Sequence, residues 1–343
     1  MMISFDQLTH ESTTIFALSI LAFLVAMLLT PIYTYFAYKY RLWKRSRTSS
    51  TTGEVLEVIN KLRTRKRNVP TMAGIIVIVA VTVVTVSFNL DKQQTLLPLL
   101  ALLGGGLVGL IDDIINVRGD GSGVAGLRAP IKFAMIVAIA AIAALYFYFK
   151  LDYTTVHIPF GGDVELGWAL IPLFILVVVS TGNAVNISDG LDGLAGGLLM
   201  SAFGAFGVIA VMQGNFGIAA FCLTVVGALL AYLWFNIAPA RFFMGDVGSF
   251  ALGTSLGVVA MLTNTLLLLP LIGLIFVIEA GSSLIQIFSK KVFHRKVFLS
   301  APVHHHLEAV GWPKTKVTMR FWVVGQVCAA VGVALALAGG YIA

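Results

Sequence analysis

Long apolar segments, separated by polar connections, make up most of the sequence. A helix needs roughly 20 consecutive apolar residues to cross the hydrocarbon core of a bilayer. About ten segments approach this length, and they lie at about 15–38, 71–90, 94–111, 130–149, 168–186, 192–212, 216–235, 247–263, 266–288 and 319–341. The pattern predicts an all-α polytopic membrane protein with about ten transmembrane helices.

The positive charges lie almost entirely on one side of this predicted topology. If successive connections alternate across the membrane, all of the 23 lysines and arginines except Lys92 and Lys150 fall on the same side. Cytoplasmic loops carry the excess of lysine and arginine, so we expect both termini outside and a single integral-membrane domain over residues 1–343. The cytoplasmic loops are then expected at about 39–70, 112–130, 187–191, 236–246 and 289–318.

One connection on the outer side has a strand pattern. Residues 150–167 contain two short runs of alternating apolar and polar residues on either side of Gly161 and Gly162. A glycine pair between two such runs is typical of a β-hairpin. We therefore expect a short external hairpin at about 150–167.

Composition supports a membrane protein and narrows the function. Hydrophobic residues make up 58% of the chain and charged residues 11%, whereas soluble domains carry about 25% charged residues. The net charge of +7 does not indicate nucleic-acid binding, because the positive charges lie in the loops that the positive-inside rule places in the cytoplasm. Cys222 and Cys328 lie in apolar runs, without a spacing that predicts a disulfide or a zinc framework.

The polar side chains that interrupt the apolar pattern gather at the predicted cytoplasmic face. They lie where predicted spans end or begin and in the loop after the ninth span: Asp112, Asp113, Asn183, Asn186, Asp189, Asp192, Asn236, Arg241, Asp246, His304, His305 and His306. The outer connections carry no comparable set of side chains. This one-sidedness indicates a reaction site at the inner membrane surface rather than a path through the membrane.

The first cluster is the aspartate pair in GLIDDIINV, residues 109–117. Asp112 and Asp113 lie at the predicted C-terminal end of a helix, where the helix dipole disfavours anions. The pair is either a solvated helix end or a site for a hard cation. Mg²⁺ is usually held by one or two carboxylates together with substrate phosphate oxygens, so the second interpretation gives the pair a function.

The second cluster is NAVNISDGLDGLAGG, residues 183–197, in which asparagine or aspartate recurs at every third position up to Asp192. Glycine-rich backbone at membrane depth is tolerated where it lines a cavity. An ordinary helix N-terminus capped by Ser188 or Asp189 is the alternative. Capping does not explain the asparagines, and a substrate-binding segment does.

The third cluster is FMGDVGS, residues 243–249, in front of an apolar segment. Asp246 is either an N-cap of the following helix or a third carboxylate for a metal. Phe243 and its neighbour Phe242 either stack on a base or anchor the chain at the membrane interface. The sequence leaves both pairs of alternatives open.

The last cluster is APVHHHLEAVGWP, residues 301–313. Three consecutive histidines cannot all face one metal, because their side chains point about 100° apart on a helix and alternate on a strand. Imidazole donors facing a diphosphate fit better, and Lys314, Lys316 and Arg320 add positive charge nearby. A loop of surface histidines is the alternative.

These motifs, in this order, closely resemble those of the phospho-N-acetylmuramoyl-pentapeptide transferases, a branch of the polyprenyl-phosphate N-acetylhexosamine-1-phosphate transferase superfamily. The resemblance covers about residues 70–322 and rests on PTMAG (70–74), IDD (111–113), NAVNISDGLDGLAGG (183–197), FMGDVGS (243–249) and PVHHHLEAVGWPKTKVTMRFW (302–322). The triple histidine followed by Gly-Trp-Pro discriminates best, because relatives that use UDP-N-acetylglucosamine typically interrupt the histidines. The chain departs from the pattern at Ala73, where the family has glycine.

The resemblance implies an enzyme of the bacterial plasma membrane with a cytoplasmic active site. It would transfer phospho-N-acetylmuramoyl-pentapeptide from its UDP derivative to undecaprenyl phosphate, forming lipid I and UMP in the first membrane step of peptidoglycan synthesis. A Mg²⁺ cofactor and a homodimer are also implied. The implied catalytic residues are Asp112, Asp113, Asp246 and His304, of which the three aspartates would hold Mg²⁺. The implied substrate-binding residues are Lys66, Thr71, Lys132, Asn186, Asp189, Asp192, Asn236, Phe243, Gln286, His304, His305 and His306.

Other interpretations compete with this one. A related transferase of UDP-N-acetylglucosamine would share the fold and most motifs. A transporter would place polar groups near the membrane midplane, and its candidate is Glu279 inside the span at 266–288. We interpret Glu279 as support for the inner-face site, because Ser282, Ser283 and Gln286 follow it toward that face. A structural scaffold gives no reason for polar clusters confined to one face.

Overall fold

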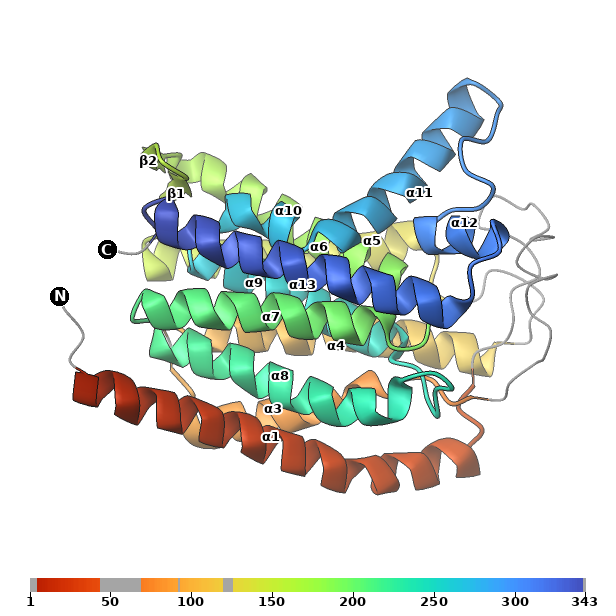
Figure 1. The fold of residues 1–343 in the computed structure, drawn as a ribbon, viewed down its shortest axis with the longest axis horizontal. Coiled ribbons are helices and arrows are strands. Elements are labelled where there is room, and N and C mark those ends of the chain that lie inside the picture. Colours follow the sequence, from red (N-terminus) through yellow and green to blue (C-terminus); the bar gives the residue numbers. More distant parts are fainter. Residues whose placement is uncertain (1–4, 44–68, 92, 120–125, 342–343) are drawn as a thin grey trace.

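The computed structural model describes residues 5–43, 69–91, 93–119 and 126–341, and its long helices except α11 run along a common direction (Figure 1). The long helices are α1 (Phe5–Lys39), α4 (Leu96–Arg118), α5 (Ala129–Leu151), α6 (Leu170–Ser188), α7 (Leu194–Met212), α8 (Phe216–Asn236), α9 (Gly245–Leu262), α11 (Leu274–Val292) and α13 (Lys314–Ala338). The shorter elements are α3 (Gly74–Phe88), α10 (Leu269–Ile272), α12 (Val303–Ala309), the 3-10 turns η1 (Gly167–Ala169) and η2 (Leu266–Leu268), and strands β1 (Thr155–Ile158) and β2 (Gly162–Glu165).

Every predicted apolar segment contains a helix, and the chain is a polytopic, all-helical membrane protein. In the described part of the chain, 8 helices are long and apolar enough to cross a membrane, or up to 9 if the bent pair α10–α11 is one span. The segment predicted at 71–90 holds α3, which is only 15 residues long. Its first residues, 71–73, are not helical, because they run beside the segment that precedes α9.

Two boundaries were predicted wrongly. The segment at 266–288 is not one straight helix, because α10 and α11 meet at Gly273 with a bend of 81°, and α11 leads away from the bundle (Figure 1). Gly273 has φ −96° and ψ 27°, outside the helical region, which breaks the ladder of backbone hydrogen bonds. The predicted loop 112–130 is helical up to Arg118, so α4 continues beyond the aspartates, which were predicted at its very end.

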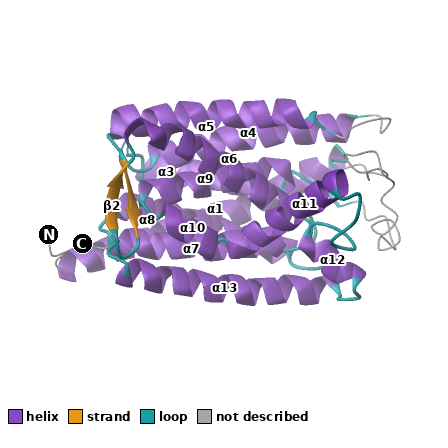
Figure 2. Cartoon of the chain, turned by 90° about the horizontal axis from the view of Figure 1, so that it is seen from above, coloured by secondary structure: helices purple, strands orange, loops and turns teal. Residues whose placement is uncertain are grey.

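The termini and the hairpin lie at one end of the bundle, and α12 lies at the opposite end (Figures 1 and 2). The hairpin pairs β1 with β2 antiparallel, with Val156 opposite Val164. His157 docks it onto the end of α13, because its Nδ1 lies 2.7 Å from a carboxylate oxygen of Asp163 and its Nε2 lies 3.0 Å from the carbonyl oxygen of Gly339. This end therefore holds structural contacts, and the polar clusters of the sequence lie at the other end.

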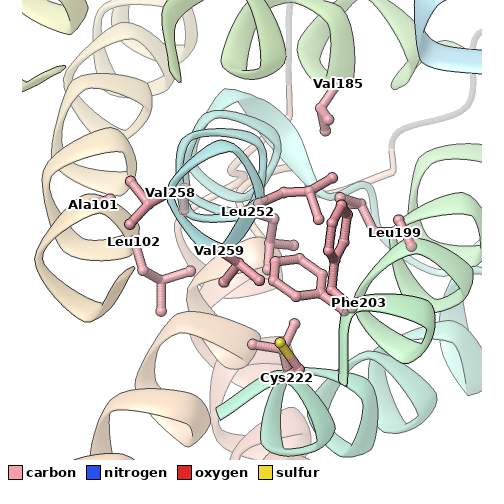
Figure 3. Packing of buried hydrophobic residues seen from close by; sticks show 14 of the residues in the cluster. Ala101, Leu102, Val185, Leu199, Phe203, Cys222, Leu252, Val258 and Val259 are labelled. Atoms are coloured by element: carbon pink, nitrogen blue, oxygen red, sulfur yellow. The ribbon is translucent and has the colours of Figure 1, made fainter. Parts of the chain in front are cut away.

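Helix α9 is the centre of the bundle. Nearly every residue of α9 is buried, and its Leu252, Val258 and Val259 pack among side chains of α4, α7 and α8 (Figure 3). In a bilayer the lipid tails are as apolar as leucine, so helices associate through close packing and interhelical hydrogen bonds. The hydroxyl group of Thr254 accordingly donates to the carbonyl oxygen of Ala101 at 2.9 Å, and that of Ser255 to Pro98 at 3.0 Å.

Glycines bring two neighbouring helices into backbone contact with the start of α9. A Cβ atom at Gly74 of α3 would lie 2.2 Å from Cα of Gly248, and one at Gly109 of α4 would lie 2.1 Å from the carbonyl oxygen of Asp246. Both distances are far below any real contact, so only glycine fits at these positions. The close approach places the last turns of α4 beside the first turn of α9.

We expect Gly109→Ala to destabilise the protein and to inactivate it. The added methyl group would push the first turn of α9 away from α4, and overpacking of this kind costs about 1–3 kcal/mol of unfolding free energy. Thermal unfolding in detergent measures the loss of stability. The control is Gly204→Ala in α7, where the added Cβ meets nothing within 4 Å. Equal melting temperatures for the two variants would contradict the prediction.

Candidate active site

An ammonium group between two carboxylates marks the centre of the polar end. Nζ of Lys132 lies 3.0 Å from Oδ2 of Asp112 and 2.9 Å from Oδ2 of Asp246. The three residues come from α5, α4 and α9. Asp112 is only 1% exposed and the Lys132 side chain 17%, so the cluster is largely shielded from water but reachable from it. Ion pairs in such surroundings are screened much less than exposed ones.

The loop in front of α5 covers the Asp112 carboxylate. The backbone N–H of Leu127 donates to Oδ1 of Asp112 at 2.7 Å. Gly126 has φ +91°, which favours glycine, and a Cβ atom there would lie 2.7 Å from the same oxygen. One carboxylate oxygen therefore faces the loop backbone and the other faces Lys132.

Asp113 has a different environment from Asp112, although the two are adjacent. Its Oδ2 accepts the backbone N–H of Val247 at 3.1 Å, in the first turn of α9. Gly245, with φ +78°, starts this helix, and a Cβ there would lie 2.5 Å from the same Asp113 oxygen. Asp113 thus caps the N-terminus of a helix distant in sequence, where the helix dipole stabilises a negative charge.

The PTMAG segment lies beside the FMGDVGS segment. Phe243 donates its backbone N–H to Pro70 at 2.8 Å, and Ala73 donates to the carbonyl oxygen of Phe243 at 3.0 Å. Thr71, between them, is fully buried, and its carbonyl oxygen accepts the hydroxyl group of Tyr33. The two sequence motifs therefore form one layer, which we call the PTMAG layer.

The two adjacent phenylalanines have different roles in this layer. Phe242 is 1% exposed and packs against the rings of Tyr33, Tyr232 and Phe235. Phe243 is 38% exposed, so its ring has a face available for a ligand. The structure thus places Phe242 in the packed interior, and the stacking prediction stays with Phe243.

Two asparagines, Asn186 of the second motif and Asn236 at the end of α8, join neighbouring segments. Asn236, which is buried, accepts the N–H of Gly193 at 3.0 Å and donates to the carbonyl oxygen of Phe242 at 2.8 Å, so both ends of its amide group are used. Asn186 donates to the hydroxyl group of Ser249 at 2.9 Å, which joins α6 to α9. These contacts connect the start of α7, the end of α8 and the segment before α9.

The loop between α6 and α7 carries Asp189 and Asp192, both half-buried. Oδ2 of Asp192 accepts the backbone N–H of Ala240 at 3.1 Å. Gly193, with φ +77°, begins α7, and its carbonyl oxygen accepts the indole N–H of Trp322 at 3.1 Å. The segment between α8 and α9 and the start of α13 therefore meet around this loop, which we call the 189–193 loop.

The three histidines lie on α12, within the predicted loop 289–318, and they point to different partners. Nδ1 of His304 lies 2.7 Å from Oε2 of Glu279, and Nδ1 of His305 lies 2.6 Å from Oε2 of Glu308. His306 accepts the backbone N–H of Leu299 at 3.2 Å through its Nδ1. The three imidazoles therefore do not converge on one ligand.

The charge states of the His305–Glu308 pair follow from burial and mutual contact. Burial lowers the pKa of His305 below its ordinary value, although the hydrogen bond and the charge of Glu308 act in the opposite direction. Burial raises the pKa of Glu308, but the hydrogen bond with His305 and the charges of His305 and Lys314 outweigh burial, so this pKa lies below its ordinary value. Glu308 is therefore an ionised acceptor at neutral pH.

Gln286 anchors the segment between α11 and α12. Its amide group donates to the carbonyl oxygen of Phe298 at 2.9 Å and accepts the N–H groups of Val297 and Phe298, both at 3.0 Å. Ser282 adds a second anchor, because its hydroxyl oxygen accepts the N–H of Val303 at 3.0 Å. Lys66, the remaining candidate, lies outside the described residues.

Sequence reasoning missed several partners in this site. Glu308, Ser249 and the backbone of residues 126–127 were not predicted to take part. Glu308 had a detectable signal, because a helix over residues 303–309 would place it three positions after His305, on the same face. The other contacts join segments distant in sequence, and no local pattern indicates them.

The donor set fits a hard divalent cation in part. Oxygens of Asp112 and Asp246 converge on one cationic group, the Lys132 ammonium, which shows that this spot favours positive charge. In the part of the chain that the structure describes, no three carboxylate, imidazole or thiolate groups form a cage for a metal. Mg²⁺ commonly takes one or two carboxylates and completes its shell with water and substrate phosphate, so the two converging carboxylates suffice.

Comparisons with known proteins agree with this geometry. The family model described as glycosyl transferase family 4 matches residues 95–264, from α4 to α9. A phospho-N-acetylmuramoyl-pentapeptide-transferase of Chloroflexus aggregans is 39% identical over 347 residues, covering 97% of this chain and 92% of that protein. One of Geobacillus kaustophilus is 38% identical over 94% of this chain and 98% of that protein. One of Bacillus mycoides is 39% identical over 91% of this chain and 94% of that protein. The chain belongs to the phospho-N-acetylmuramoyl-pentapeptide-transferase family.

Proposed function

We propose that the protein transfers phospho-N-acetylmuramoyl-pentapeptide from its UDP derivative to undecaprenyl phosphate, with lipid I and UMP as products. This reaction is the first membrane step of peptidoglycan synthesis. Its relatives in three bacterial genera carry this activity in their names and match more than nine-tenths of the chain. The observation that carries the proposal is the Asp112–Lys132–Asp246 cluster, because it can bind both phosphate charge and a divalent cation.

We also propose a setting for the reaction. The chain would be one integral-membrane domain of the bacterial plasma membrane, with the α12 end in the cytoplasm and the termini and hairpin outside. This orientation is supported by the excess of lysine and arginine in the connections that the sequence predicts on the cytoplasmic side. It places the site where a water-soluble sugar nucleotide and the phosphate of an inner-leaflet lipid can meet. A homodimer is the assembly that the family resemblance implies.

The residues of this chain would mainly align the phosphate groups and neutralise the charge on their oxygens. Phosphoryl transfer depends on alignment and on neutralising the charge of the phosphate oxygens. The Lys132 ammonium can contact one phosphate oxygen, and the 189–193 loop with the imidazoles of α12 can orient the diphosphate. Phe243 offers an exposed ring face to the uracil. The nucleotide would thus lie between the 189–193 loop and the PTMAG layer.

The lipid phosphate does not need a strong base. Its second pKa is near 6, as for other phosphate monoesters, so much of it is already dianionic at neutral pH. Asp112, fixed by Leu127 and Lys132, would orient this nucleophile rather than deprotonate it. Mg²⁺, held by Asp112 and Asp246 with Asp113 behind them, would supply further positive charge to the phosphate oxygens. The attacking lipid oxygen forms a bond to the sugar phosphate, and UMP leaves.

The deciding experiment is UMP release by the purified protein in detergent. The assay contains undecaprenyl phosphate and Mg²⁺, with UDP-N-acetylmuramoyl-pentapeptide or UDP-N-acetylglucosamine offered in parallel. We expect UMP from the first nucleotide only, and none from an Asp246→Ala variant.

The two other outcomes would correct the proposal in different ways. UMP from UDP-N-acetylglucosamine alone would keep the chemistry and replace the substrate. UMP from neither nucleotide would reject the transferase and favour a transporter. A transporter would need the Glu279 carboxylate for its substrate path. Glu279 instead contacts His304 of α12, which favours the transferase.

A further inference from the structure

Two basic side chains at the start of α13 lie against one indole ring. Nζ of Lys316 lies 4.7 Å from the centroid of the Trp312 ring, and the guanidinium carbon of Arg320 lies 4.6 Å from it. Trp312 belongs to the short connection between α12 and α13 and is half-buried, whereas both cations are exposed. The face of an aromatic ring attracts a cation, so Trp312 holds the two side chains in place.

Among the described residues, no carboxylate pairs with these two cations. Lys316 and Arg320 are four positions apart, so they share one face of α13 and repel each other. Glu308 is the last acidic residue of the sequence, and its carboxylate already contacts His305 and Lys314. The ion pairs of the described chain include neither Lys316 nor Arg320. An anion from outside the chain would relieve their repulsion.

The two cations face away from the 189–193 loop. The opposite face of α13 holds that loop, because the Thr318 hydroxyl group and the Trp322 indole donate to its carbonyl oxygens at 3.3 and 3.1 Å. Successive residues of a helix are rotated by about 100°, so Thr318 lies about 200° round the helix from Lys316. The same angle separates Trp322 from Arg320. The cations are therefore directed at a different anion from the diphosphate that this loop would orient.

The nucleotide of the proposed reaction carries a second kind of anion. Its pentapeptide is joined to the muramoyl group through the amino end, so the other end is a free carboxylate. Five extended residues span about 17 Å, which exceeds the diameter of a helix with its side chains, about 10–12 Å. The peptide can thus pass from one face of α13 to the other. UDP-N-acetylglucosamine has no peptide, so a carboxylate site on this face would distinguish the two nucleotides.

We propose that Lys316 and Arg320, held by Trp312, bind the terminal carboxylate of the peptide of the sugar nucleotide. The inference rests on the proposed function and deepens it, because it names the residues that recognise the peptide. A guanidinium group can donate two parallel hydrogen bonds to a carboxylate. Exposed ion pairs contribute little when two long side chains must first be ordered. The contact with the indole ring orders these side chains before the peptide binds.

Two nucleotides that differ only at this carboxylate test the inference in the UMP-release assay. One is UDP-N-acetylmuramoyl-pentapeptide, and the other is the same molecule with its terminal carboxylate converted to a carboxamide. We expect the KM of the native protein to be about fivefold higher for the amide than for the acid, the upper end for an exposed charge pair. The KM for undecaprenyl phosphate should be the same with either nucleotide.

Variants then show which side chains produce this ratio of KM values. In a protein that carries both Lys316→Gln and Arg320→Gln, the KM for the acid should rise to the native KM for the amide, which itself should not change. Trp312→Leu should lower the ratio, because the cations are no longer held, and Trp312→Phe should keep most of it. The control is Lys291→Gln, which removes an exposed positive charge at the end of α11 and should keep the native ratio.

Several outcomes would overturn the inference. Equal KM values for acid and amide in the native protein would do so, as would a native ratio in the double variant or in Trp312→Leu. A double variant that raises the KM for both nucleotides, or for undecaprenyl phosphate, by one common factor would assign the cations to anionic lipid headgroups instead. Should the double variant fail to fold, Arg320→Gln alone must lower the ratio. A native protein that releases no UMP would reject the proposed function itself.

Discussion

Replacing Asp246 by asparagine is expected to lower the rate of UMP release by about a hundredfold to a thousandfold, the range observed when one group that stabilises transition-state charge is removed. Asparagine preserves the shape of the side chain at the start of α9 but removes the negative charge that lies 2.9 Å from Lys132. The cluster then offers one converging carboxylate, that of Asp112, to a cation. The variant should therefore also need a higher Mg²⁺ concentration for half-maximal rate.

The matched control is Asp163→Asn in the hairpin, at the opposite end of the bundle. The Asp163 side chain is largely exposed, and its carboxylate lies 2.7 Å from Nδ1 of His157 in the same hairpin, so this variant should retain the native rate and Mg²⁺ requirement. Thermal unfolding of both variants in detergent shows whether the fold is intact. A folded Asp246→Asn protein with a rate within about threefold of native would rule out a role for this carboxylate in the chemistry.

Replacing Lys132 by methionine is expected to lower the rate by a similar factor, about a hundredfold, because one cationic group that can contact a phosphate oxygen is lost. The Mg²⁺ concentration needed for half-maximal rate should change in the opposite direction from that in Asp246→Asn. Without the ammonium, no lysine charge lies between the carboxylates of Asp112 and Asp246, and a divalent cation relieves their repulsion. We therefore expect half-maximal rate at a lower Mg²⁺ concentration than in the native protein.

The stability of Lys132→Met provides a second measurement. Removing one partner from a fully buried ion pair destabilises a protein by about 3–5 kcal/mol. The Lys132 and Asp246 side chains are 17% and 13% exposed, so we expect a smaller loss, seen as a lower melting temperature without Mg²⁺. Added Mg²⁺ should restore part of it. Lys150→Met is the control, because Lys150 is an exposed residue near the other end of α5. A variant that melts as the native protein does and needs the same Mg²⁺ concentration would show that the three residues do not form one cation site.

The opposite shifts in Mg²⁺ requirement make the two variants informative as a pair. A site that merely loses structure would respond to both substitutions in the same direction. A site in which lysine and metal share two carboxylates must respond in opposite directions, because one substitution removes a negative charge and the other a positive charge. The comparison therefore tests whether lysine and Mg²⁺ share the two carboxylates, and it needs no structure with a bound ligand.

The sequence alone determined the class of the protein and the end at which its chemistry gathers. Long apolar segments in a bilayer satisfy their backbone by forming helices, and each predicted segment contains a helix in the described chain. The order of the polar motifs identified the family, and the comparisons confirmed it. The individual roles of Asp112, Asp246 and the other site residues stay predictions, since each motif allowed more than one interpretation.

Only the tertiary structure decided which polar groups contact each other. Lys132 reaches Asp112 and Asp246 because glycine contacts draw α4 onto α9, and such contacts between distant segments leave no local trace in the sequence. Asn236 and Gln286 use their amide groups to hold backbone, and their contact with substrate stays a prediction.

The histidines show the same division most clearly. The sequence established that three adjacent imidazoles cannot share one ligand, because the side-chain directions along a helix or a strand are fixed by backbone geometry. It did not establish where each imidazole points. That depended on α12 forming against the bent helix α11, which brings Glu279 to His304 across 25 residues of sequence. Which group each imidazole contacts depends on distances in three dimensions, and those distances are set only when the helices pack.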